Sequence, residues 1–203
     1  RRWKKGVIRC LRLQPGMTIL DLCAGTGDLA RYAVSYDPAA QVCALDFSWE
    51  MMKQGLCRHP GPSHAVTWIN GDAMHLPFAS ATFDRAMVGF GLRNVAHLDQ
   101  TLSEILRVLK PGGRFVSLDT AAVRWKCLLP FWSLYMEYWV PLLGKLLARS
   151  QGMYGYLSAS SSHFLQPGPL SEAFQHNGFI QTGYTYQPRW LGGAALVWGD
   201  KPR

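Results

Sequence analysis

The chain has 203 residues, of which 48% are hydrophobic and 17% are charged, so it is too apolar for a disordered protein and long enough for one domain with a substantial core. Lys and Arg outnumber Asp and Glu by 21 to 13, and the net charge of +8 suits RNA, an anionic membrane surface or an acidic substrate as well as a basic protein with none of these partners. The five cysteines are odd in number and contain no C-x-x-C pair, which argues against a disulfide framework or a zinc site and favours a reducing cytosol.

The chain opens on RRWKK, which has the character of a mid-helix segment, so we expect a further N-terminal piece and infer nothing from the lack of a targeting signal. Helical periodicity then alternates with short apolar runs. In chain order we predict a helix over 2–12, a strand over 17–23, a helix over 28–36, a strand over 41–46, a helix capped by Ser48, strands over 65–71 and 83–91, a helix over 98–109, a strand over 114–120, a helix over 169–178, and strands over 179–186 and 191–199. We expect Met51, Met52 and Leu56 on the buried side of the third helix, and Lys110-Pro111-Gly112-Gly113 to stop the fourth. The alternation predicts an α/β fold with a mostly parallel sheet and helices on both faces.

Residues 125–147 form an aromatic-rich stretch that could be mistaken for a transmembrane span. Lys126, Glu137 and two prolines within it argue against that interpretation. We therefore predict a single domain over 1–203, in which 125–165 is a helical insertion packed over the ligand edge of the sheet.

A glycine turn, Gly25-Thr26-Gly27, follows the first predicted strand, where open parallel sheets bind their ligands. Its sequence GTGDLA fits the loose dinucleotide fingerprint, but Asp21 and Asp28 flank it and would repel a pyrophosphate. S-adenosylmethionine carries no phosphate and has an ammonium, a sulfonium and one carboxylate. Acids near the turn can bind its ammonium while backbone N–H groups bind its carboxylate, so the turn favours this cofactor.

Two further acids follow strands at positions that suit a nucleoside. Asp46 ends the second strand 19 residues after Gly27, the spacing at which a carboxylate accepts both ribose hydroxyls. Asp72 follows the third strand and can accept from the adenine amino group, with the Ala73 N–H facing a ring nitrogen, while Phe47 can pack on the adenine. Each acid alone could be a helix cap or a solvated loop residue, but three successive strands that close on aspartate favour a nucleoside site.

At this level of detail the chain resembles class I S-adenosylmethionine-dependent methyltransferases and, more narrowly, the UbiE/MenG family of ubiquinone and menaquinone C-methyltransferases. The matching motifs are LDLCAGTGDLA (20–30), LDFSWEMM (45–52), NGDAMHLPF (70–78), FDRAMVGFGLRNV (83–95) and LRVLKPGGRF (106–115), of which GFGLRNV is the narrow one. The resemblance implies a Rossmann-like, seven-stranded sheet with an antiparallel last strand, and cofactor contacts at Thr26, Asp46, Asp72, Ala73 and Gly89. Asp119-Thr120-Ala121 and the stretch 159–165 depart from the family pattern on the acceptor side, which leaves the acceptor open.

A quinol ring carbon becomes a good nucleophile when a neighbouring hydroxyl ionises, so the enzyme needs a cation near that oxygen or a base. Arg93, just past the fourth strand, is the candidate cation, and Asn94 could hold the second oxygen. The other interpretation of Arg93 is an ion pair with Asp72 or Asp119 that braces the loop. His163 is the candidate base, with His75, His97, Tyr154, Tyr156 or water in reserve.

The preferred function is C-methylation of a demethylmenaquinol, a demethylphylloquinol or a ubiquinol precursor in prenylquinone biosynthesis. The aromatic insertion would then contact the prenyl chain, and basic residues would contact anionic lipid, which predicts a cytoplasmic protein in peripheral contact with an inner or organellar membrane. A homodimer or a complex of biosynthetic enzymes stays open. The alternatives are a methyltransferase of a soluble phenol or polyketide, a non-catalytic cofactor-binding scaffold, and an RNA methyltransferase. No cysteine follows a proline and no Asn/Asp-Pro-Pro-aromatic box occurs, so we do not expect nucleic acid as a partner. Because no C-x-x-C pair occurs, we expect no metal.

Overall fold

The computed structural model describes residues 2–58, 66–123, 165–188 and 192–203. Every helix and strand predicted within these ranges is present, and all but one end within two residues of the predicted limits. The elements are α1 (Arg2–Leu11), β1 (Thr18–Leu22), α2 (Asp28–Tyr36), β2 (Gln41–Asp46), α3 (Trp49–Arg58), β3 (Val66–Asn70), β4 (Phe83–Gly89), the 3₁₀ helix η1 (Leu92–Asn94), α4 (Leu98–Val108), β5 (Leu109–Val123), α8 (Pro167–His176), β6 (Ile180–Gln187) and β7 (Gly192–Asp200). The predicted insertion over 125–165 lies outside the described residues, apart from Leu165.

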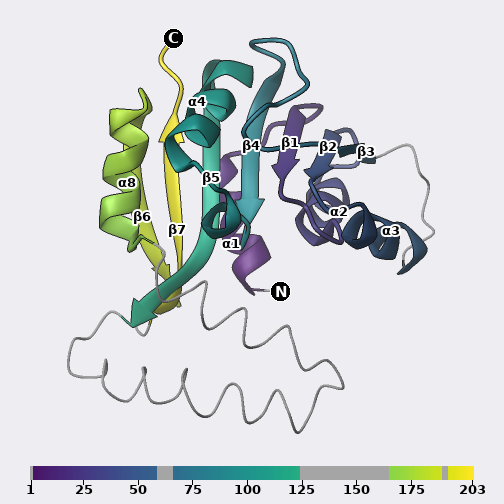
Figure 1. Cartoon of the computed structure of the whole chain (residues 1–203), viewed down its shortest axis with the longest axis horizontal. Helices are drawn as coiled ribbons and strands as arrows, with labels where there is room; N and C mark the ends of the chain where they lie inside the picture. The colour runs from purple at the N-terminus through teal and green to yellow at the C-terminus, as the bar shows by residue number, and fades with distance from the viewer. Residues whose placement is uncertain (1, 59–65, 124–164, 189–191) are drawn as a thin grey trace, which may run out of the picture.

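The strands form one seven-stranded sheet in the order β3-β2-β1-β4-β5-β7-β6. The pairs along β3-β2-β1-β4-β5 are parallel, and β7 runs antiparallel to both β5 and β6, as the family resemblance implied. The chain moves outward from β1 to β3 and then returns to place β4 on the other side of β1 (Figure 1). This reversal puts a ligand crevice at the carboxyl ends of β1 and β4.

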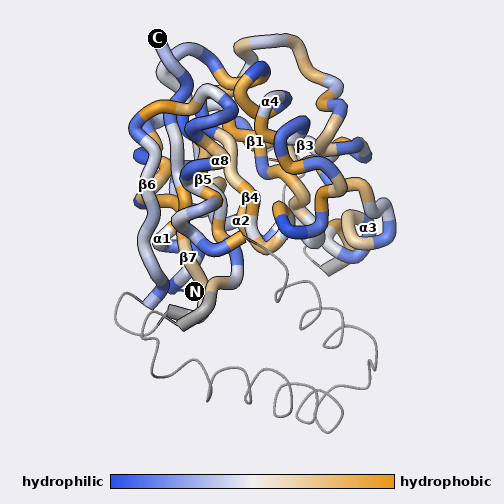
Figure 2. Tube along the Cα trace, turned by 60° about the vertical axis from the view of Figure 1, so that its left-hand side comes forward, coloured by the Kyte–Doolittle hydropathy of each residue, from blue (hydrophilic) through white to orange (hydrophobic). Residues whose placement is uncertain are grey.

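Helices cover the two faces of the sheet, and each face has its own hydrophobic core. On one face α1 and α2 bury residues such as Val7, Ile8 and Ala30 against the sheet, and on the other face α4 and α8 bury residues such as Ile105 and Phe174 (Figure 1). The central strands are mostly hydrophobic, and Figure 2 shows a hydrophobic stretch at β4, although Asp84 and Arg85 lie near the start of that strand. The edge strand β6 is largely polar. Burial on both faces explains why the central strands appear in the sequence as continuous apolar runs.

One local expectation, on the buried side of α3, was wrong, and one strand begins earlier than expected. Of the three residues expected on the buried side of α3, only Met52 is buried, and Met51 and Leu56 are exposed. The helix approaches the glycine turn through Gly55, where an added Cβ would lie 2.5 Å from the Thr26 carbonyl oxygen, so its buried stripe is narrow. The fourth helix ends at Val108, just before Lys110–Gly113, as expected, but this segment already lies inside β5, as an irregularity between the pairs Phe83–Leu109 and Arg85–Arg114.

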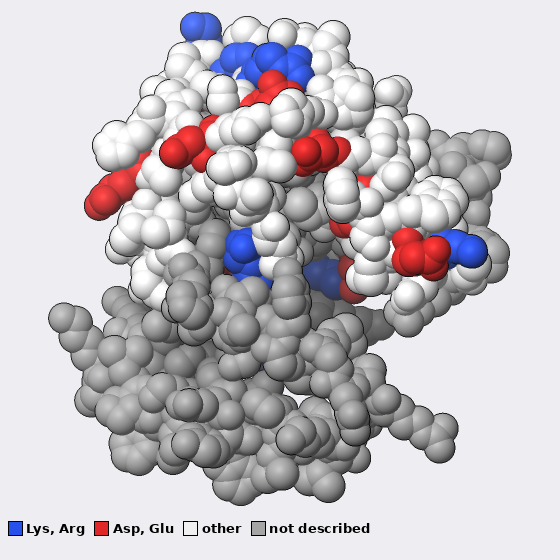
Figure 3. Space-filling model, viewed as in Figure 1, with Lys and Arg blue, Asp and Glu red and all other residues white. Residues whose placement is uncertain are grey.

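Basic side chains gather at the end of the molecule where the strands of the parallel sheet begin, near the C-terminus (Figure 3). Several are paired with carboxylates. Arg107 lies 2.7 Å from Glu104, Lys110 lies 2.9 Å from Asp84, and Arg114 lies 2.6 Å from Asp200. Much of the positive charge at this end is therefore balanced locally, and it lies at the opposite end of the sheet from the ligand crevice.

The turn between β1 and α2 depends on a glycine for two separate reasons. Gly27 has a φ of 73°, in the left-handed region, and an added Cβ would lie 2.2 Å from the Trp68 ring. Arg31 of α2 stacks 6.0 Å from the centre of the same ring and donates hydrogen bonds to the carbonyls of Thr26 and Gly55. The turn is thus held between α2, β3 and α3.

We predict that Gly27→Ala destabilises the protein by at least about 3 kcal/mol, which combines about 1–2 kcal/mol for the left-handed backbone with the cost of overpacking against Trp68. Gly16→Ala is the matched control, because Gly16 has a φ of 77° and no atom within 4 Å of its added Cβ. Gly16→Ala should lower the free energy of unfolding only by the contribution of the left-handed backbone. Urea unfolding measures both variants, and equal losses would contradict the close packing of the turn on Trp68.

Candidate functional site

The three aspartates predicted from the sequence lie at the carboxyl ends of neighbouring strands. Asp21 is in β1, Asp46 is the last residue of β2, and Asp72 follows the end of β3 at Asn70. Gly89, the last residue of β4, lies on the other side of β1. The parallel register brings these ends to one edge of the sheet, so the fold places the predicted cofactor residues in one row.

Asp46 joins β2 to the glycine turn. Its Oδ2 accepts a hydrogen bond of 2.6 Å from the Gly25 N–H, and its Oδ1 accepts one of 2.7 Å from the Ser48 N–H. Ser48 in turn caps α3 by accepting from the Met51 N–H at 3.3 Å. A carboxylate has about four lone-pair positions, so these two bonds orient Asp46 and leave capacity for two hydroxyl donors. The adjacent Phe47 is 81% exposed, as a side chain that packs on a ligand ring would be before the ligand binds.

Asp72 begins a loop that leads to β4. Its Oδ1 accepts from the Met74 N–H at 2.9 Å, and its Oδ2 lies 3.3 Å from Nδ1 of His75. The Met74 hydrogen bond, helped by His75, holds the pKa of Asp72 below its usual value, so the side chain is a carboxylate at neutral pH. Ala73 is buried beside it. His75, a reserve candidate for the catalytic base, therefore serves as a partner of Asp72.

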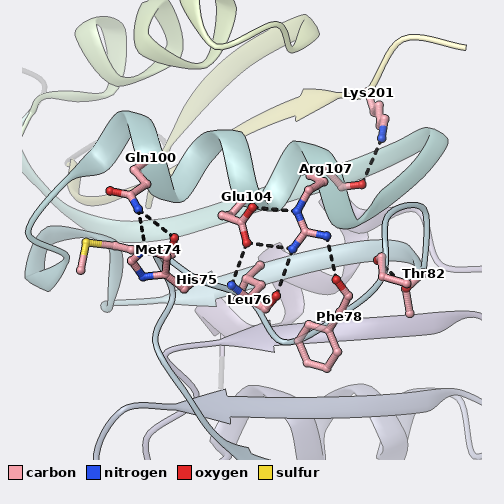
Figure 4. A network of polar contacts seen from close by, with 10 residues as sticks. Met74, His75, Leu76, Phe78, Thr82, Gln100, Glu104, Arg107 and Lys201 are labelled. Carbon is pink, nitrogen blue, oxygen red and sulfur yellow. Dashed lines mark hydrogen bonds and ion pairs between the residues drawn. The ribbon is translucent and has the colours of Figure 1, made fainter.

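One face of α4 holds this loop through its backbone (Figure 4). Glu104 accepts from the Leu76 N–H at 2.7 Å, and Arg107 donates to the carbonyls of Leu76 at 3.0 Å and Phe78 at 2.7 Å. Gln100 donates to the Met74 carbonyl at 3.1 Å and lies 3.0 Å from Nε2 of His75. Sequence reasoning missed this network, although the i, i+4, i+7 spacing of these three α4 residues on one helix face was visible.

Asp21 is the most deeply buried acid of the site, with a relative exposure of 1%. Its Oδ2 accepts from the Ala30 N–H at 2.8 Å, whereas its Oδ1 has no hydrogen-bond partner among the described residues. Burial raises the pKa of Asp21 to about 7, and the nearby Asp46 adds to the effect. Asp21 and Gly89 both line a cavity of about 150 Å³. A buried carboxylate with an open oxygen fits a cationic ligand and not a phosphate, so the residues present suit the methyl donor.

Arg93 and Asn94 belong to η1, beyond β4, as predicted. The Arg93 side chain is 4% exposed, and its Nη1 lies 2.6 Å from Oδ1 of Asp119 at the end of the parallel part of the sheet. The guanidinium also lies 5.7 Å from the centre of the Phe90 ring. Of the two interpretations of Arg93 raised by the sequence, the ion pair with Asp119 is thus present. Asn94 is exposed, and its N–H donates to the Gly91 carbonyl.

The Arg93–Asp119 ion pair leaves one buried polar atom of each residue without a hydrogen-bond partner among the described residues. Within the described ranges, neither Nε of Arg93 nor Oδ2 of Asp119 has a hydrogen-bond partner. Burial raises the pKa of Asp119, although the Arg93 charge opposes the shift. His163, the predicted base, lies outside the described residues, and so do Tyr154 and Tyr156. His97 lies at the N-terminus of α4 and is exposed.

A larger cavity, of about 700 Å³, opens at the other end of the sheet, where Thr18, Gln41 and Phe83 begin their strands. Its lining among the described residues carries no acidic or basic side chain. A choice of the candidate site by cavity volume alone would therefore select this cavity and not the row of aspartates. In the part of the chain that the structure describes, no group of three or more His, Cys, Asp or Glu residues is placed to hold a metal ion, and no helix is long and apolar enough to cross a bilayer.

Comparisons with known proteins agree with this geometry. The ubiE/COQ5 methyltransferase family matches residues 1–201. A ubiquinone/menaquinone biosynthesis C-methyltransferase UbiE of Desulfotalea psychrophila is 37% identical over 98% of this chain and 80% of that protein. A demethylmenaquinone methyltransferase of Desulfitobacterium hafniense is 38% identical over 99% of this chain and 80% of that protein. A solved structure of Haemonchus contortus phosphoethanolamine N-methyltransferase 2 in complex with S-adenosyl-L-methionine has a TM-score of 0.75 at 18% identity, over 100% of this chain and 53% of that one, a likeness of fold alone. The Rossmann-like class I methyltransferase fold is confirmed.

The raised pKa of Asp21 has a consequence for stability. A carboxyl whose pKa rises on folding costs stability above its unfolded pKa, and the cost is complete above its folded pKa. The pKa of Asp21 rises from 3.8 to about 7. Asp21→Asn should therefore raise the free energy of unfolding at pH 8 by about 1–3 kcal/mol, with a gain that shrinks toward pH 4. Urea titrations at several pH values measure this gain, and Asp99→Asn at an exposed site is the control.

The same variant should weaken binding of the methyl donor, because an amide carries no charge to pair with an ammonium. In the unaltered protein, affinity should rise with pH through about 7 as Asp21 ionises. Calorimetry measures both effects. An Asp21→Asn protein that is more stable at pH 8 but binds the donor with unchanged affinity would remove Asp21 from the site.

Proposed function

Because the chain belongs to the ubiE/COQ5 methyltransferase family, we propose that it methylates a ring carbon of a quinol in prenylquinone biosynthesis, with S-adenosylmethionine as its methyl donor. The observation that carries the proposal is the similarity of 37–38% over nearly the whole chain to two proteins named for ubiquinone and menaquinone methylation. The acceptor class is a demethylmenaquinol, a demethylphylloquinol or a ubiquinol precursor.

The cofactor site of this proposal consists of the glycine turn and the strand ends. Asp46 accepts the ribose hydroxyls, and Asp72 with the Ala73 N–H binds the adenine edge, against which Phe47 packs. Asp21, Gly25, Thr26, Gly27 and Gly89 surround the amino-acid end. Support comes from the Gly25–Asp46 bond, which orients that carboxylate, and from the hold of α4 on the Asp72 loop. When bound, S-adenosylmethionine supplies an electrophilic methyl group on a sulfonium.

The acceptor side begins at η1. A quinol carbon attacks well only when a neighbouring hydroxyl loses its proton, and a guanidinium near that oxygen favours the ionised form. Arg93 takes this role in our proposal, and Asn94 holds the second oxygen. The Asp119 bond fixes the direction of the guanidinium but also balances part of its charge, so orientation contributes more to catalysis than net charge does.

Asp119 adds a second candidate for the base. Its carboxyl is 3% exposed, its pKa is raised by burial, and its Oδ2 has no partner in the described part of the chain. A carboxylate with these properties accepts a proton more readily than an exposed one. His163 stays the prediction from sequence, and a pH–rate profile of Asp119→Asn beside one of His163→Ala assigns the base to one of the two.

We also propose that the protein contacts anionic lipid at a membrane surface. The exposed face of α1 carries Arg2, Lys5 and Arg9, and such a face can contact anionic lipid at roughly 1 kcal/mol per residue. We expect the protein to sediment with anionic vesicles and to be released by high salt.

The local pairing of Arg107, Lys110 and Arg114 with acids argues against an RNA-binding surface at the basic end of the sheet.

Mass spectrometry of the quinone pool after deletion of the gene tests the proposed function. A demethyl-quinone should accumulate, and re-expression of the unaltered chain should remove it. Re-expression of Arg93→Ala is the control for a catalytic rather than a scaffolding role. An unchanged quinone pool in the deletion strain would contradict the proposal.

For the isolated enzyme we predict that Arg93→Ala lowers kcat by about a hundredfold or more, with little change in cofactor affinity, because the charge on the acceptor oxygen develops during the transfer. Arg93→Lys should restore activity only in part, since an ammonium lacks the planar fork that Asp119 holds. Raising the pH should partly restore Arg93→Ala by ionising the acceptor in solution.

Removing Arg93 alone leaves Asp119 buried without its cation and can destabilise the fold. The double variant Arg93→Ala/Asp119→Ala removes both charges and keeps the test valid. Because Asp119 is itself a candidate base, Asp119→Ala alone is the reference, and the double variant should have a kcat about a hundredfold or more below that reference. Normal turnover at saturating cofactor in a folded double variant would make the pair a structural brace.

A further inference from the structure

The cavity of about 150 Å³ beside Asp21 has walls from five parts of the chain, namely α1, β1 with its turn, α2, the end of β4, and β5. Its lining includes Trp3 and Lys4 of α1, Asp21 of β1, Asp28 of α2, and Gly89 and Phe90 at the end of β4. Thus α1, which the sequence presents only as a basic amphipathic helix, forms one wall of the cofactor crevice. The function proposed above gives α1 no role in that crevice.

Opposite charges face this cavity from different elements. On one side Oδ1 of Asp21 is buried and, among the described residues, without a hydrogen-bond partner. On the other side the Lys4 ammonium lies 2.8 Å from Oδ2 of Asp28, and both of these residues also line the cavity. An ammonium has three donors, so Lys4 can hold Asp28 and still donate to a ligand. A cavity with an open carboxylate and an available ammonium is complementary to a zwitterion.

The position of Lys4 is fixed by its helix. Val7, Ile8 and Leu11 of α1 are fully buried against the sheet, and the Trp3 ring lies 5.6 Å from that of Phe90. Lys4 therefore projects from an anchored turn and not from a loop. The N-terminus of α2, which begins at Asp28, adds a partial positive charge on the same side and favours a carboxylate there.

We propose that Lys4 binds the carboxylate of the amino-acid end of the methyl donor, opposite the Asp21 carboxylate that receives the ammonium. Without Lys4, Asp21 and Asp28 would make the cavity acidic, and it would attract the ammonium but repel the carboxylate. With Lys4, the cavity selects nucleosides that carry an α-amino acid over those that do not. This inference rests on the proposed position of the cofactor at the glycine turn.

Two nucleosides separate the role of Lys4 from a general effect on the site. S-adenosylhomocysteine carries the amino-acid end, and 5′-methylthioadenosine has the same adenosine and thioether without it. Lys4→Ala should weaken binding of the first by about 10- to 100-fold, as expected for the loss of a charged hydrogen bond, and change binding of the second by less than about twofold. Lys5→Ala, at the exposed neighbouring position, should change neither. Isothermal titration calorimetry measures all of these affinities.

Folding is not expected to limit the experiment, because the Lys4–Asp28 pair has side chains 32% and 64% exposed, and such pairs contribute little stability. Lys4→Met keeps the apolar stem and should show the same selective loss. If Lys4→Ala and Lys4→Met weaken binding of both nucleosides equally, Lys4 maintains the shape of the turn and does not bind the carboxylate, which would overturn the inference. Unchanged binding of both nucleosides would also overturn it. If the unaltered protein binds 5′-methylthioadenosine as tightly as S-adenosylhomocysteine, the zwitterion subsite is wrong while the nucleoside site stands. If it binds neither, the cofactor position itself is wrong.

Discussion

The hydrogen bond from the Gly25 N–H to the Asp46 carboxylate, 2.6 Å long, joins the glycine turn after β1 to the end of β2. The turn comes this close with Gly27 against Trp68 in a left-handed conformation and with Arg31, which lies over the same ring, donating to the Thr26 carbonyl. The same carboxylate also accepts a hydrogen bond from the N–H of Ser48, the residue just before α3. The residues proposed to bind the nucleoside are therefore part of the framework of the sheet.

The rest of the site extends from this joint in two directions. Toward β3, Glu104 and Arg107 of α4 hold the Asp72 loop, so a helix on the opposite face of the sheet from α1 and α2 positions the residues proposed to bind the adenine. Toward β4, α1 and Phe90 line the cavity beside Asp21, and the guanidinium of the buried Arg93–Asp119 pair lies 5.7 Å from the centre of the Phe90 ring. Buried polar atoms without partners among the described residues occur at Asp21, Arg93, Ser117 and Asp119. Such atoms cost stability. Asp21 lines the cavity beside the glycine turn, whereas Ser117 and Asp119 line a separate small cavity, so the open carboxylate of Asp21 is the one that faces the proposed cofactor.

The sequence predicted the order of the elements well, and also that Asp21, Asp46 and Asp72 lie at neighbouring strand ends, because both depend on local signals. That these aspartates bind a cofactor stays a prediction. Strands buried on both faces appear as short apolar runs, and the acids close those runs directly. Contacts between distant residues had no such signal. Lys4 and Asp28 are 24 residues apart, Arg93 and Asp119 are 26 apart, and Glu104 and Leu76 are 28 apart. Met51 and Leu56 were misplaced because periodicity shows which residues share a helix face but not how closely that face approaches the sheet, which Gly55 decides here.

We propose that three successive strand ends form one cofactor site. A crystal structure of the protein with S-adenosylhomocysteine tests this proposal most directly. We expect the ribose hydroxyls on Asp46, the adenine amino group on Asp72, and the amino-acid end between Asp21 and Lys4. A nucleoside bound away from these residues, for example in the larger cavity at the starts of the strands, would contradict it.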